Sequence, residues 1–337
     1  MIVAVTGASG FVGSNLVSAL VEQGHTVRAL IRSPETLPRS VIESAGPDGR
    51  ASQIELHRGD VLEPGSLSRV FADAEVVFHL AARISISRHD GEAVLRTNIE
   101  GPRNVAAACL ASGVRRMVHF SSVHAFRVPK GDLPMDESTP LVHEAAAPAY
   151  DRSKSLGEQQ VMQAVERGLD AVILNPSGIM GPGDHGPSRL GRTVLDFARG
   201  RFPMLVPGVY NWVDVRDVVA SALAAAERGQ RGQKYIIGGE VGSVRRIAEL
   251  VAESGGKPAP RYSAPLWLLH PVAPVIETWA HWLKASPLLT PQALDILQSP
   301  CDFRSEKASR ELGHSPRPLA DTIRDTMQWF RQNGHLS

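Results

Sequence analysis

The stretch VTGASGFVG, residues 5–13, decides the fold of this chain. It spaces Gly7, Gly10 and Gly13 as G-x-x-G-x-x-G, directly after a strand-like apolar run and at the opening of a helical pattern. In that setting backbone N–H groups and the positive end of a helix hold a pyrophosphate. Gly7 would permit the tight turn, Gly10 the close approach of phosphate, and Gly13 the packing of helix on strand. The stretch therefore predicts a dinucleotide-binding unit.

Strand-like runs and helical patterns alternate beyond this stretch. The runs that predict strands lie at 2–6, 26–31, 54–58, 76–80, 116–122, 170–175 and 234–238; the helical patterns lie at 11–23, 64–72, 92–112, around Tyr150 and at 213–229. Strands that are apolar on both faces indicate a parallel sheet covered by helices on both sides. We predict an α/β fold with a Rossmann-type, doubly wound parallel sheet.

The composition changes after Asn175, where Pro and Gly become dense and the later segments are mostly helical. This change predicts a smaller, mostly helical C-terminal substrate lobe. The predicted division is 1–176 with about 211–239 for the dinucleotide domain, and about 177–210 with 240–337 for the substrate lobe. A polar surface loop is expected at 38–51.

Composition excludes several classes of function. The 36 basic and 35 acidic side chains of the 337 residues give a net charge of +1, which favours neither nucleic acid nor an anionic membrane as a partner. Cys109 and Cys301 form no metal or redox motif, which fits a reducing compartment. No apolar run reaches the ~18 residues of a spanning helix, and MIVAVTG is typical of a strand rather than a signal peptide. We expect a soluble, cytoplasmic protein.

The twelve histidines predict no metal site, because none forms an H-E-x-x-H motif or a Cys/His cluster. They are interpreted as core or surface residues. His124 and His143 lie close in sequence to site motifs and could touch a substrate.

The end of the second strand-like run bears on the choice of cofactor. An NAD site has Asp or Glu there to bond the ribose 2′-hydroxyl, whereas TVRALIRSPE (26–35) carries Arg28 and Arg32 and no acid before Glu35. A guanidinium pairs with a 2′-phosphate. Arg32 therefore favours NADP (NADPH), with NAD as the alternative and simple surface solvation of Arg32 as the competing interpretation.

A second motif, AYDRSKSLGE (149–158), places Tyr150 four positions before Lys154. On a helix these two side chains share a face. A phenol and an ammonium together are a candidate acid–base pair, although the spacing alone often arises by chance.

Seven motifs together resemble the extended short-chain dehydrogenases/reductases over almost the whole chain. In family order they are TGASGFVG (6–13), GDV (59–61), HLAA (79–82), TNIEGPRNV (97–105), FSSVHAF (120–126), YDRSK (150–154) and NPSGIMGPG (175–183). Within this NAD-dependent epimerase/dehydratase superfamily the chain is most similar to the dihydroflavonol-reductase-like group. That group includes 3β-hydroxysteroid dehydrogenase relatives and proteins called hopanoid-associated sugar epimerases. The motifs do not identify a substrate.

The resemblance implies a catalytic triad of Ser122, Tyr150 and Lys154. Tyr150 would exchange the proton, Lys154 would activate it, and Ser122 would bond the substrate oxygen. A nearby ammonium and oxidised nicotinamide would lower the pKa of the phenol. Asn98 would support the lysine side of the site. The cofactor contacts implied overall are Gly7, Ser9, Gly10, Phe11, Val12, Gly13, Arg32, Asp60, Val61, Leu80, Ala81, Ala82, Asn98, Ser121, Tyr150, Lys154, Pro176 and Ile179.

The leading hypothesis is an NADP-dependent reductase or dehydrogenase that acts on the carbonyl/secondary alcohol pair of a small, fairly apolar molecule. An epimerase of a sugar or sugar nucleotide with bound NAD is the alternative, and a cofactor-sensing regulator is the remote one, since such regulators typically lose the Tyr–Lys pair. A 4,6-dehydratase is disfavoured because Val123 and His124 replace its Asp-Glu pair. In VYNWVDVRDV (209–218) Tyr210 stands where sugar-nucleotide enzymes carry Arg, though Arg189, Arg192 or Arg201 could substitute.

The segment 264–289 carries three of the five tryptophans: Trp267, Trp279 and Trp282. Its apolar residues recur at roughly helical spacing, at Val272, Val275, Ile276, Trp279, Trp282 and Leu283. Three interpretations stand: core packing of the small lobe, an apolar lid over the nicotinamide end, and a membrane-surface helix. The last fits less well because Lys284 is the only Lys or Arg there. The oligomeric state is left open, with a homodimer as one possibility.

Overall fold

The computed structural model describes residues 1–33, 53–84, 90–129, 133–282, 290–299 and 301–336. The surface loop expected at 38–51 lies outside these residues. None of the described helices is both long and apolar enough to cross a membrane.

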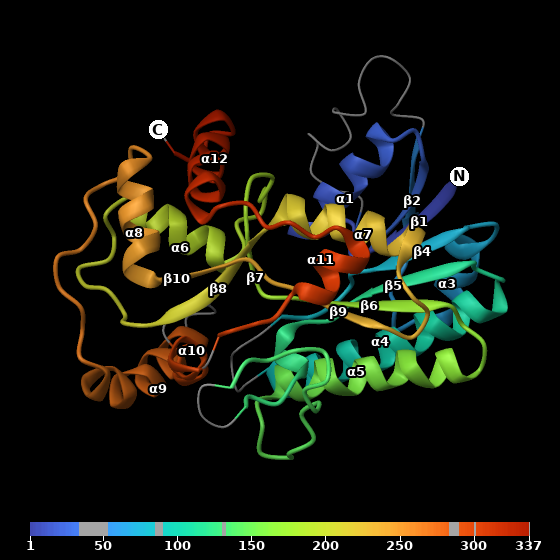
Figure 1. Cartoon of the computed structure of the whole chain (residues 1–337), viewed down its shortest axis with the longest axis horizontal. Helices are drawn as coiled ribbons and strands as arrows, with labels where there is room; N and C mark the ends of the chain where they lie inside the picture. The colour runs from blue at the N-terminus through green and yellow to red at the C-terminus, as the bar shows by residue number, and fades with distance from the viewer. Residues whose placement is uncertain (34–52, 85–89, 130–132, 283–289, 300, 337) are drawn as a thin grey trace.

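A seven-stranded parallel sheet forms the larger part of the molecule (Figure 1), with the order β3-β2-β1-β4-β5-β6-β9. Its strands are β1 (Ile2–Thr6), β2 (Thr26–Ile31), β3 (Ile54–Arg58), β4 (Val76–His79), β5 (Arg116–Phe120), β6 (Ala171–Pro176) and β9 (Lys234–Ile237). The order reverses direction at β1, which is the switch point of a doubly wound fold where ligands bind. The predicted fold class is confirmed.

Helices cover both faces of this sheet. One face carries α1 (Phe11–Glu22), α7 (Val215–Arg228) and α11 (Glu306–Leu312); the other carries α3 (Pro64–Phe71), α4 (Gly91–Ala111) and α5 (Ala149–Glu166). Each face has its own apolar cluster, because strand residues alternate between the two sides. Val3 and Val5 face the first cluster, and Ala4 faces the second.

A second, three-stranded sheet with the order β10-β8-β7 was not predicted. Its strands are β7 (Gly178–Met180), β8 (Val209–Asp214) and β10 (Glu240–Ser243). The helical pattern expected from residue 213 was wrong by two residues, since α7 begins only after β8 ends. The strands are short and two of them lie beside Pro- and Gly-rich segments, so they lack the apolar alternation that indicates a strand.

Helices α6 (Arg189–Ala198), α8 (Val244–Glu253) and α12 (Leu319–Gln332) pack on the small sheet around a third apolar cluster. Helices α9 (Leu266–Trp282) and α10 (Pro291–Gln298) complete this part of the chain. Ala308 and Leu312 of α11, by contrast, pack with α7 in a cluster of the large sheet. The division of the chain into two lobes at the stated bounds remains a prediction.

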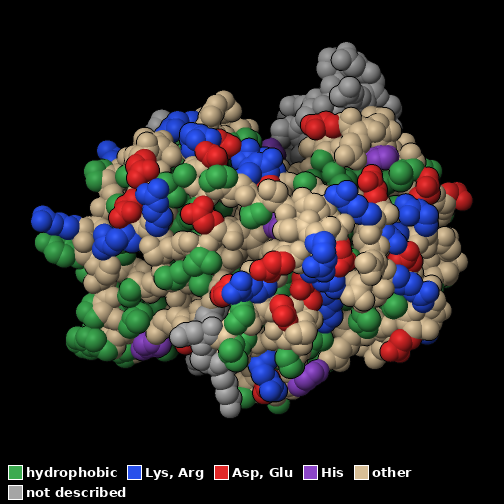
Figure 2. Space-filling model, in the orientation of Figure 1, with side chains coloured by type: hydrophobic (Ala, Val, Ile, Leu, Met, Phe, Trp, Pro, Cys, Tyr) green, Lys and Arg blue, Asp and Glu red, His purple; other side chains and the backbone are tan. Residues whose placement is uncertain are grey.

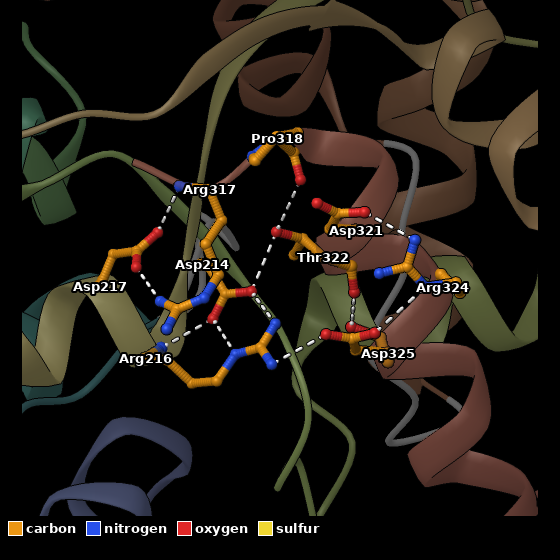
Figure 3. Close-up of polar contacts among 10 residues, drawn as sticks. Asp214, Arg216, Asp217, Arg317, Pro318, Asp321, Thr322, Arg324 and Asp325 are labelled. Carbon is orange, nitrogen blue, oxygen red and sulfur yellow. Dashed lines mark hydrogen bonds and ion pairs between the residues drawn. The ribbon is translucent and has the colours of Figure 1, made fainter. Parts of the chain in front are cut away.

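A buried carboxylate joins the two sheets (Figure 3). Asp214, the last residue of β8, caps α7 by accepting from Arg216 N at 2.8 Å and also accepts from the Arg216 guanidinium at 2.9 and 2.7 Å. Thr322 on α12 donates to it at 2.9 Å, and Arg216 continues to Asp325 at 2.8 Å. Burial raises the pKa of Asp214. The hydrogen bonds and charge of Arg216 have a larger, opposite effect, so the pKa lies below its usual value.

We expect Asp214→Ala to lower the free energy of unfolding by about 3 kcal/mol, because it removes a helix cap and leaves Asp325 as the one remaining carboxylate partner described for the half-buried Arg216 guanidinium. Urea denaturation followed by circular dichroism measures this loss. The matched control is Asp302→Ala, which removes an exposed partner of Arg304 and should change stability by no more than about 0.5 kcal/mol. Equal losses in the two variants would contradict this account of the junction.

Candidate active site

The glycine loop joins β1 to α1 in a conformation that its glycines make possible. Gly7 has a φ of +72°, and a Cβ there would lie 2.6 Å from Ala81 N. A Cβ at Gly13 would lie 2.1 Å from Gly7 O. A Cβ at Gly10 would meet only Gly7 O at 3.3 Å. Packing within the protein thus requires glycine at 7 and 13, whereas a requirement at Gly10 would have to come from a ligand.

The start of α1 suits an anion. Its N-cap residue is Gly10, which has no side chain to cap the helix, so backbone N–H groups of the first turn remain available. The predicted contacts Ser9, Phe11 and Val12 are half-buried in this same loop and first turn. The positions fit a dinucleotide phosphate.

Ser121 and Ser122 follow β5 at the carboxyl end of the sheet, on the same edge as the glycine loop. Ser121 Oγ is buried and has no hydrogen-bond partner among the described residues, as expected of a group that faces a cofactor. Ser122 Oγ accepts from His124 N at 3.2 Å. Because that bond uses an acceptor position, the Ser122 hydroxyl proton stays available to Tyr150 or to a substrate oxygen.

Tyr150 and Lys154 lie one turn apart on α5, and both side chains are buried. Burial raises the pKa of Tyr150 to about 12; a hydrogen bond with Ser122 lowers it, and the negative charge of Asp151 raises it. This direction is opposite to the lowering expected from the sequence. In the protein alone, loss of water around the phenolate is the largest effect.

The Lys154 ammonium donates to Phe120 O at 2.9 Å. Burial lowers the pKa of Lys154 to about 8, although Glu158, one turn further along α5, acts in the opposite direction. Lys154 therefore loses its proton far more readily than an exposed lysine. Its backbone bond directs the ammonium toward the end of β5, where the two serines lie.

Glu158 belongs to a buried network that sequence reasoning missed. Asn175 donates to Glu158 Oε1 at 2.6 Å and to Ser122 O at 3.0 Å, while Lys234 Nζ lies 2.5 Å from Glu158 Oε2. The network thus ties the backbone of Ser122 to α5, β6 and β9. The only signal in the sequence was an acidic residue four positions after the motif lysine, and its partners lie elsewhere in the chain.

His124, Asp151 and Tyr210 form a cluster beside Tyr150. His124 Nε2 lies 3.1 Å from the Tyr210 hydroxyl, and His124 Nδ1 lies 3.4 Å from Asp151 Oδ1. The His124 ring meets the Tyr150 ring edge-on, with centroids 5.8 Å apart. The cluster brings β8 of the small sheet against α5 of the large one.

Asn98 clamps the loop that follows β4. Its amide oxygen accepts from Arg83 N at 2.8 Å, and its nitrogen donates to Arg83 O and to Ser153 Oγ, both at 2.9 Å. The two hydrogen bonds to the Arg83 backbone hold the half-buried Leu80, Ala81 and Ala82 next to Gly7. Asn98 therefore positions predicted cofactor contacts through the protein backbone.

The remaining predicted cofactor residues are spread along the same sheet edge. Arg32 is exposed directly after β2, whereas Arg28 pairs with Glu55 at 2.9 Å and also bonds Ala72 O. Only Arg32 of the two is thus a candidate for a 2′-phosphate. Half-buried Asp60 and buried Val61 follow β3, Pro176 ends β6, and half-buried Ile179 lies in β7.

Two strand histidines lie under the site. His79 and His119 stack with ring centroids 5.2 Å apart, and His79 Nδ1 lies 2.7 Å from Thr6 Oγ1. Burial, then the charge of Lys154, lowers the pKa of His79 to about 3. Both rings are therefore neutral core residues. Within the described part of the chain, no group of three His, Cys, Asp or Glu side chains could hold a metal ion.

Comparison with known proteins gives the family of this chain. The model of the NAD dependent epimerase/dehydratase family matches residues 3–238. This chain belongs to that family. Its members use nicotinamide cofactors, as the family description states, so the chain is an enzyme of the NAD-dependent epimerase/dehydratase superfamily.

Three relatives of this family member cover nearly its full length. Sterol demethylase protein B of Methylococcus capsulatus is 34% identical over 98% of this chain and 99% of its own. A putative dihydroflavonol 4-reductase of Synechocystis is 36% identical over 98% of this chain and 95% of its own. The crystal structure of gox2253 superposes with a TM-score of 0.83 at 36% identity, covering 100% of this chain and 99% of that one.

The lowered pKa of Lys154 has a consequence for stability. Below pH about 8 the folded protein holds a buried ammonium at a cost, and this cost disappears as the pH rises from about 8 to about 10, where the unfolded lysine also loses its proton. Wild-type stability should therefore rise relative to Lys154→Met over that range, by a few kcal/mol.

Urea unfolding of both proteins at a series of pH values measures the difference. The exposed Lys257→Met variant is the control, and its difference from wild type should not change with pH. A constant difference for Lys154→Met would show that Lys154 does not carry a depressed pKa.

Proposed function

We propose that this family member is an NADP-dependent oxidoreductase. It moves a hydride between nicotinamide C4 and a carbonyl or secondary alcohol of a small, fairly apolar substrate. The observation that carries the proposal is the pair of buried side chains Tyr150 and Lys154, one turn apart on α5, with Ser122 and the glycine loop at the carboxyl end of the same sheet. A phenol, a hydroxyl donor and an ammonium together handle the proton that accompanies hydride transfer.

Each residue of the triad has a separate role in this proposal. Ser122, whose Oγ accepts from His124 N, donates its proton toward the substrate oxygen and so holds it beside Tyr150. Tyr150 gives a proton to that oxygen during reduction and takes it back during oxidation. Lys154 supplies the positive charge that favours the phenolate. The bound nicotinamide supplies or accepts the hydride.

The preference for NADP rests on Arg32. It is exposed at the end of β2, next to the half-buried Asp60 region that follows β3. Arg28, the other basic side chain of this stretch, is engaged by Glu55. A guanidinium at the ribose position favours a 2′-phosphate, whereas a carboxylate would have favoured NAD.

The apolar character of the substrate is supported by the cluster around Tyr210. This tyrosine is buried, bonds His124, and packs edge-on against Trp212 and Phe303 with centroids 5.4 and 5.8 Å away. Tyr210 stands where the resemblance places the arginine with which sugar-nucleotide enzymes bind a pyrophosphate, and its surroundings are aromatic. A relative named for sterol, an apolar ring system that carries a hydroxyl group, points to the same substrate class.

An epimerase with bound NAD remains the alternative, since the same triad could return the hydride to the opposite face of a sugar. It would need basic groups for the nucleotide. Arg192 bonds Pro187 O at 2.9 Å and Arg201 pairs with Asp196 at 3.0 Å. Two of the three candidate arginines thus have partners within the protein, and Arg189 also interacts there, which supports the oxidoreductase.

The experiment that separates these functions is an NADPH-oxidation screen over aldehydes, ketones, steroids and nucleotide sugars, with NADH as the control. Net oxidation of NADPH by an apolar ketone supports the proposal. Interconversion of a sugar without net oxidation, together with NAD that stays bound during purification, would replace it with the epimerase.

Tyr150→Phe keeps the ring and its packing but removes the group that carries the proton. We expect turnover to fall by about 100-fold or more while NADPH still binds. Steady-state kinetics and fluorescence titration with NADPH measure the two effects. Tyr262→Phe, at an exposed tyrosine, is the matched control and should keep wild-type turnover. Near-normal turnover in Tyr150→Phe would remove this residue from the mechanism.

Arg32→Ala should narrow the preference for NADPH over NADH by about tenfold or more, because a charge-assisted bond contributes about 1.5–3 kcal/mol. Titration of wild type and variant with both cofactors gives the two ratios. The control is Arg69→Ala, an exposed arginine on α3, which should leave the ratio unchanged. Equal affinity of the wild type for the two cofactors would refute the assignment.

A further inference from the structure

Helix α9 presents large apolar side chains to solvent. Trp267 is 76% exposed, Trp279 is 72% exposed and Val275 is 60% exposed. Soluble proteins rarely leave such residues together on one surface unless something binds there. Core packing of the small lobe, expected as one interpretation, is therefore wrong for these three side chains; that of Trp282 is not described.

The exposed apolar residues share one side of the helix. At about 100° per residue, six of them fall within half of the helix circumference: Trp267, Leu268, Val272, Val275, Ile276 and Trp279. Ala273 and Glu277 lie on the opposite side and are buried, at 0% and 4% exposure. The carboxylate of the helix thus points inward while the apolar residues point outward, the reverse of an ordinary surface helix.

Positive charge borders this apolar face. The segment that leads into α9 contains exposed Lys257 and Arg261, and Arg245 of α8 bonds Ser263 Oγ at 3.1 Å. From residue 254 to residue 276 the chain contains no Asp or Glu. Figure 2 shows hydrophobic side chains gathered at the lower left, where Figure 1 places α9 and α10, with Lys and Arg side chains higher on the same side.

We propose that α9 is a membrane-binding surface that lies in the headgroup region of an anionic bilayer. Tryptophan side chains favour the interface between lipid and water, and exposed basic residues favour anionic headgroups. With 17 residues at 1.5 Å each the helix is about 25 Å long, which suits lying in the interface rather than crossing it. This inference rests on the proposed function, since an apolar substrate of the sterol type is found in membranes.

The sequence argued against a membrane-surface helix because α9 lacks a basic polar face. The fold shows why α9 does not need one. An isolated surface helix needs such a face because water covers it, whereas the inward side of α9 packs on the protein, including α10. The basic residues are supplied instead by the preceding segment and by α8. A second copy of the chain is a poorer occupant, because a two-fold contact over α9 would bring like charges of both borders together.

Vesicle co-sedimentation with the full-length protein tests this proposal. Wild type should bind vesicles of phosphatidylcholine and phosphatidylglycerol, bind pure phosphatidylcholine more weakly, and show a blue-shifted tryptophan emission when bound. Trp267→Ser and Trp279→Ser should each weaken binding about tenfold, and the double variant should bind negligibly. Both side chains are largely exposed, so thermal stability should stay unchanged. The control, Val241→Ser, removes a 49% exposed apolar side chain from β10 and should bind like wild type.

Several results would overturn the proposal. Absence of wild-type binding to both kinds of vesicle would contradict it. Unchanged binding of the double variant would contradict it as well. A wild-type dimer in analytical ultracentrifugation that the double variant loses would assign the face to self-association instead. Vesicle binding requires no turnover, so failure of the proposed reaction is seen separately: in the double variant, NADPH oxidation by a small water-soluble ketone should stay at the wild-type level.

Discussion

The carboxylate of Asp214 sets the geometry on which the rest of this structure depends. It ends β8 in the small sheet, caps α7 on the large sheet, and is bonded by Arg216 and Thr322. A buried charge of this kind is stable only when every partner is in place. It therefore holds β8 in one position against the large sheet, and with β8 it holds Tyr210 four residues earlier.

The position of Tyr210 matters because the candidate active site is shared between the two sheets. The large sheet supplies Tyr150 from α5 and Ser122 from the end of β5, and the small sheet supplies Tyr210 across His124. The site is also buried, and this burial raises the pKa of Tyr150 and lowers that of Lys154. Both shifts work against the charged forms, so a phenolate needs the hydrogen bond of Ser122 and any positive charge in the same buried space to gain stability.

Helix α9 turns its apolar residues outward because they are not needed for packing within the chain. Its inward side buries Ala273 and Glu277, so the small lobe is complete without the tryptophans of the outward side. Side chains that add nothing to the packing of the chain itself are available for an external surface. An enzyme whose substrate is apolar gains from this arrangement, because the bilayer holds the substrate at high local concentration.

The sequence by itself determined the doubly wound sheet, the glycine loop between β1 and α1, and the family. Gly7 and Gly13 are required by local backbone contacts within one βα unit, and Tyr150 and Lys154 are brought together by helical spacing alone. Such short-range constraints can be read directly from residue order. The family motifs added Ser122, whose place beside Tyr150 depends on two segments of the fold.

Only the tertiary structure decided the small sheet, the buried network and the orientation of α9. Glu158 meets Lys234 and Asn175, and Tyr210 meets His124, through contacts between residues far apart in the chain. In the protein without cofactor the pKa of Tyr150 lies above its usual value, whereas the sequence predicted a lowering by a nearby ammonium and oxidised nicotinamide; burial is the largest cause of the difference. Residue spacing carries no measure of burial, and an apolar helix has the same periodicity whether its tryptophans face a core or a membrane.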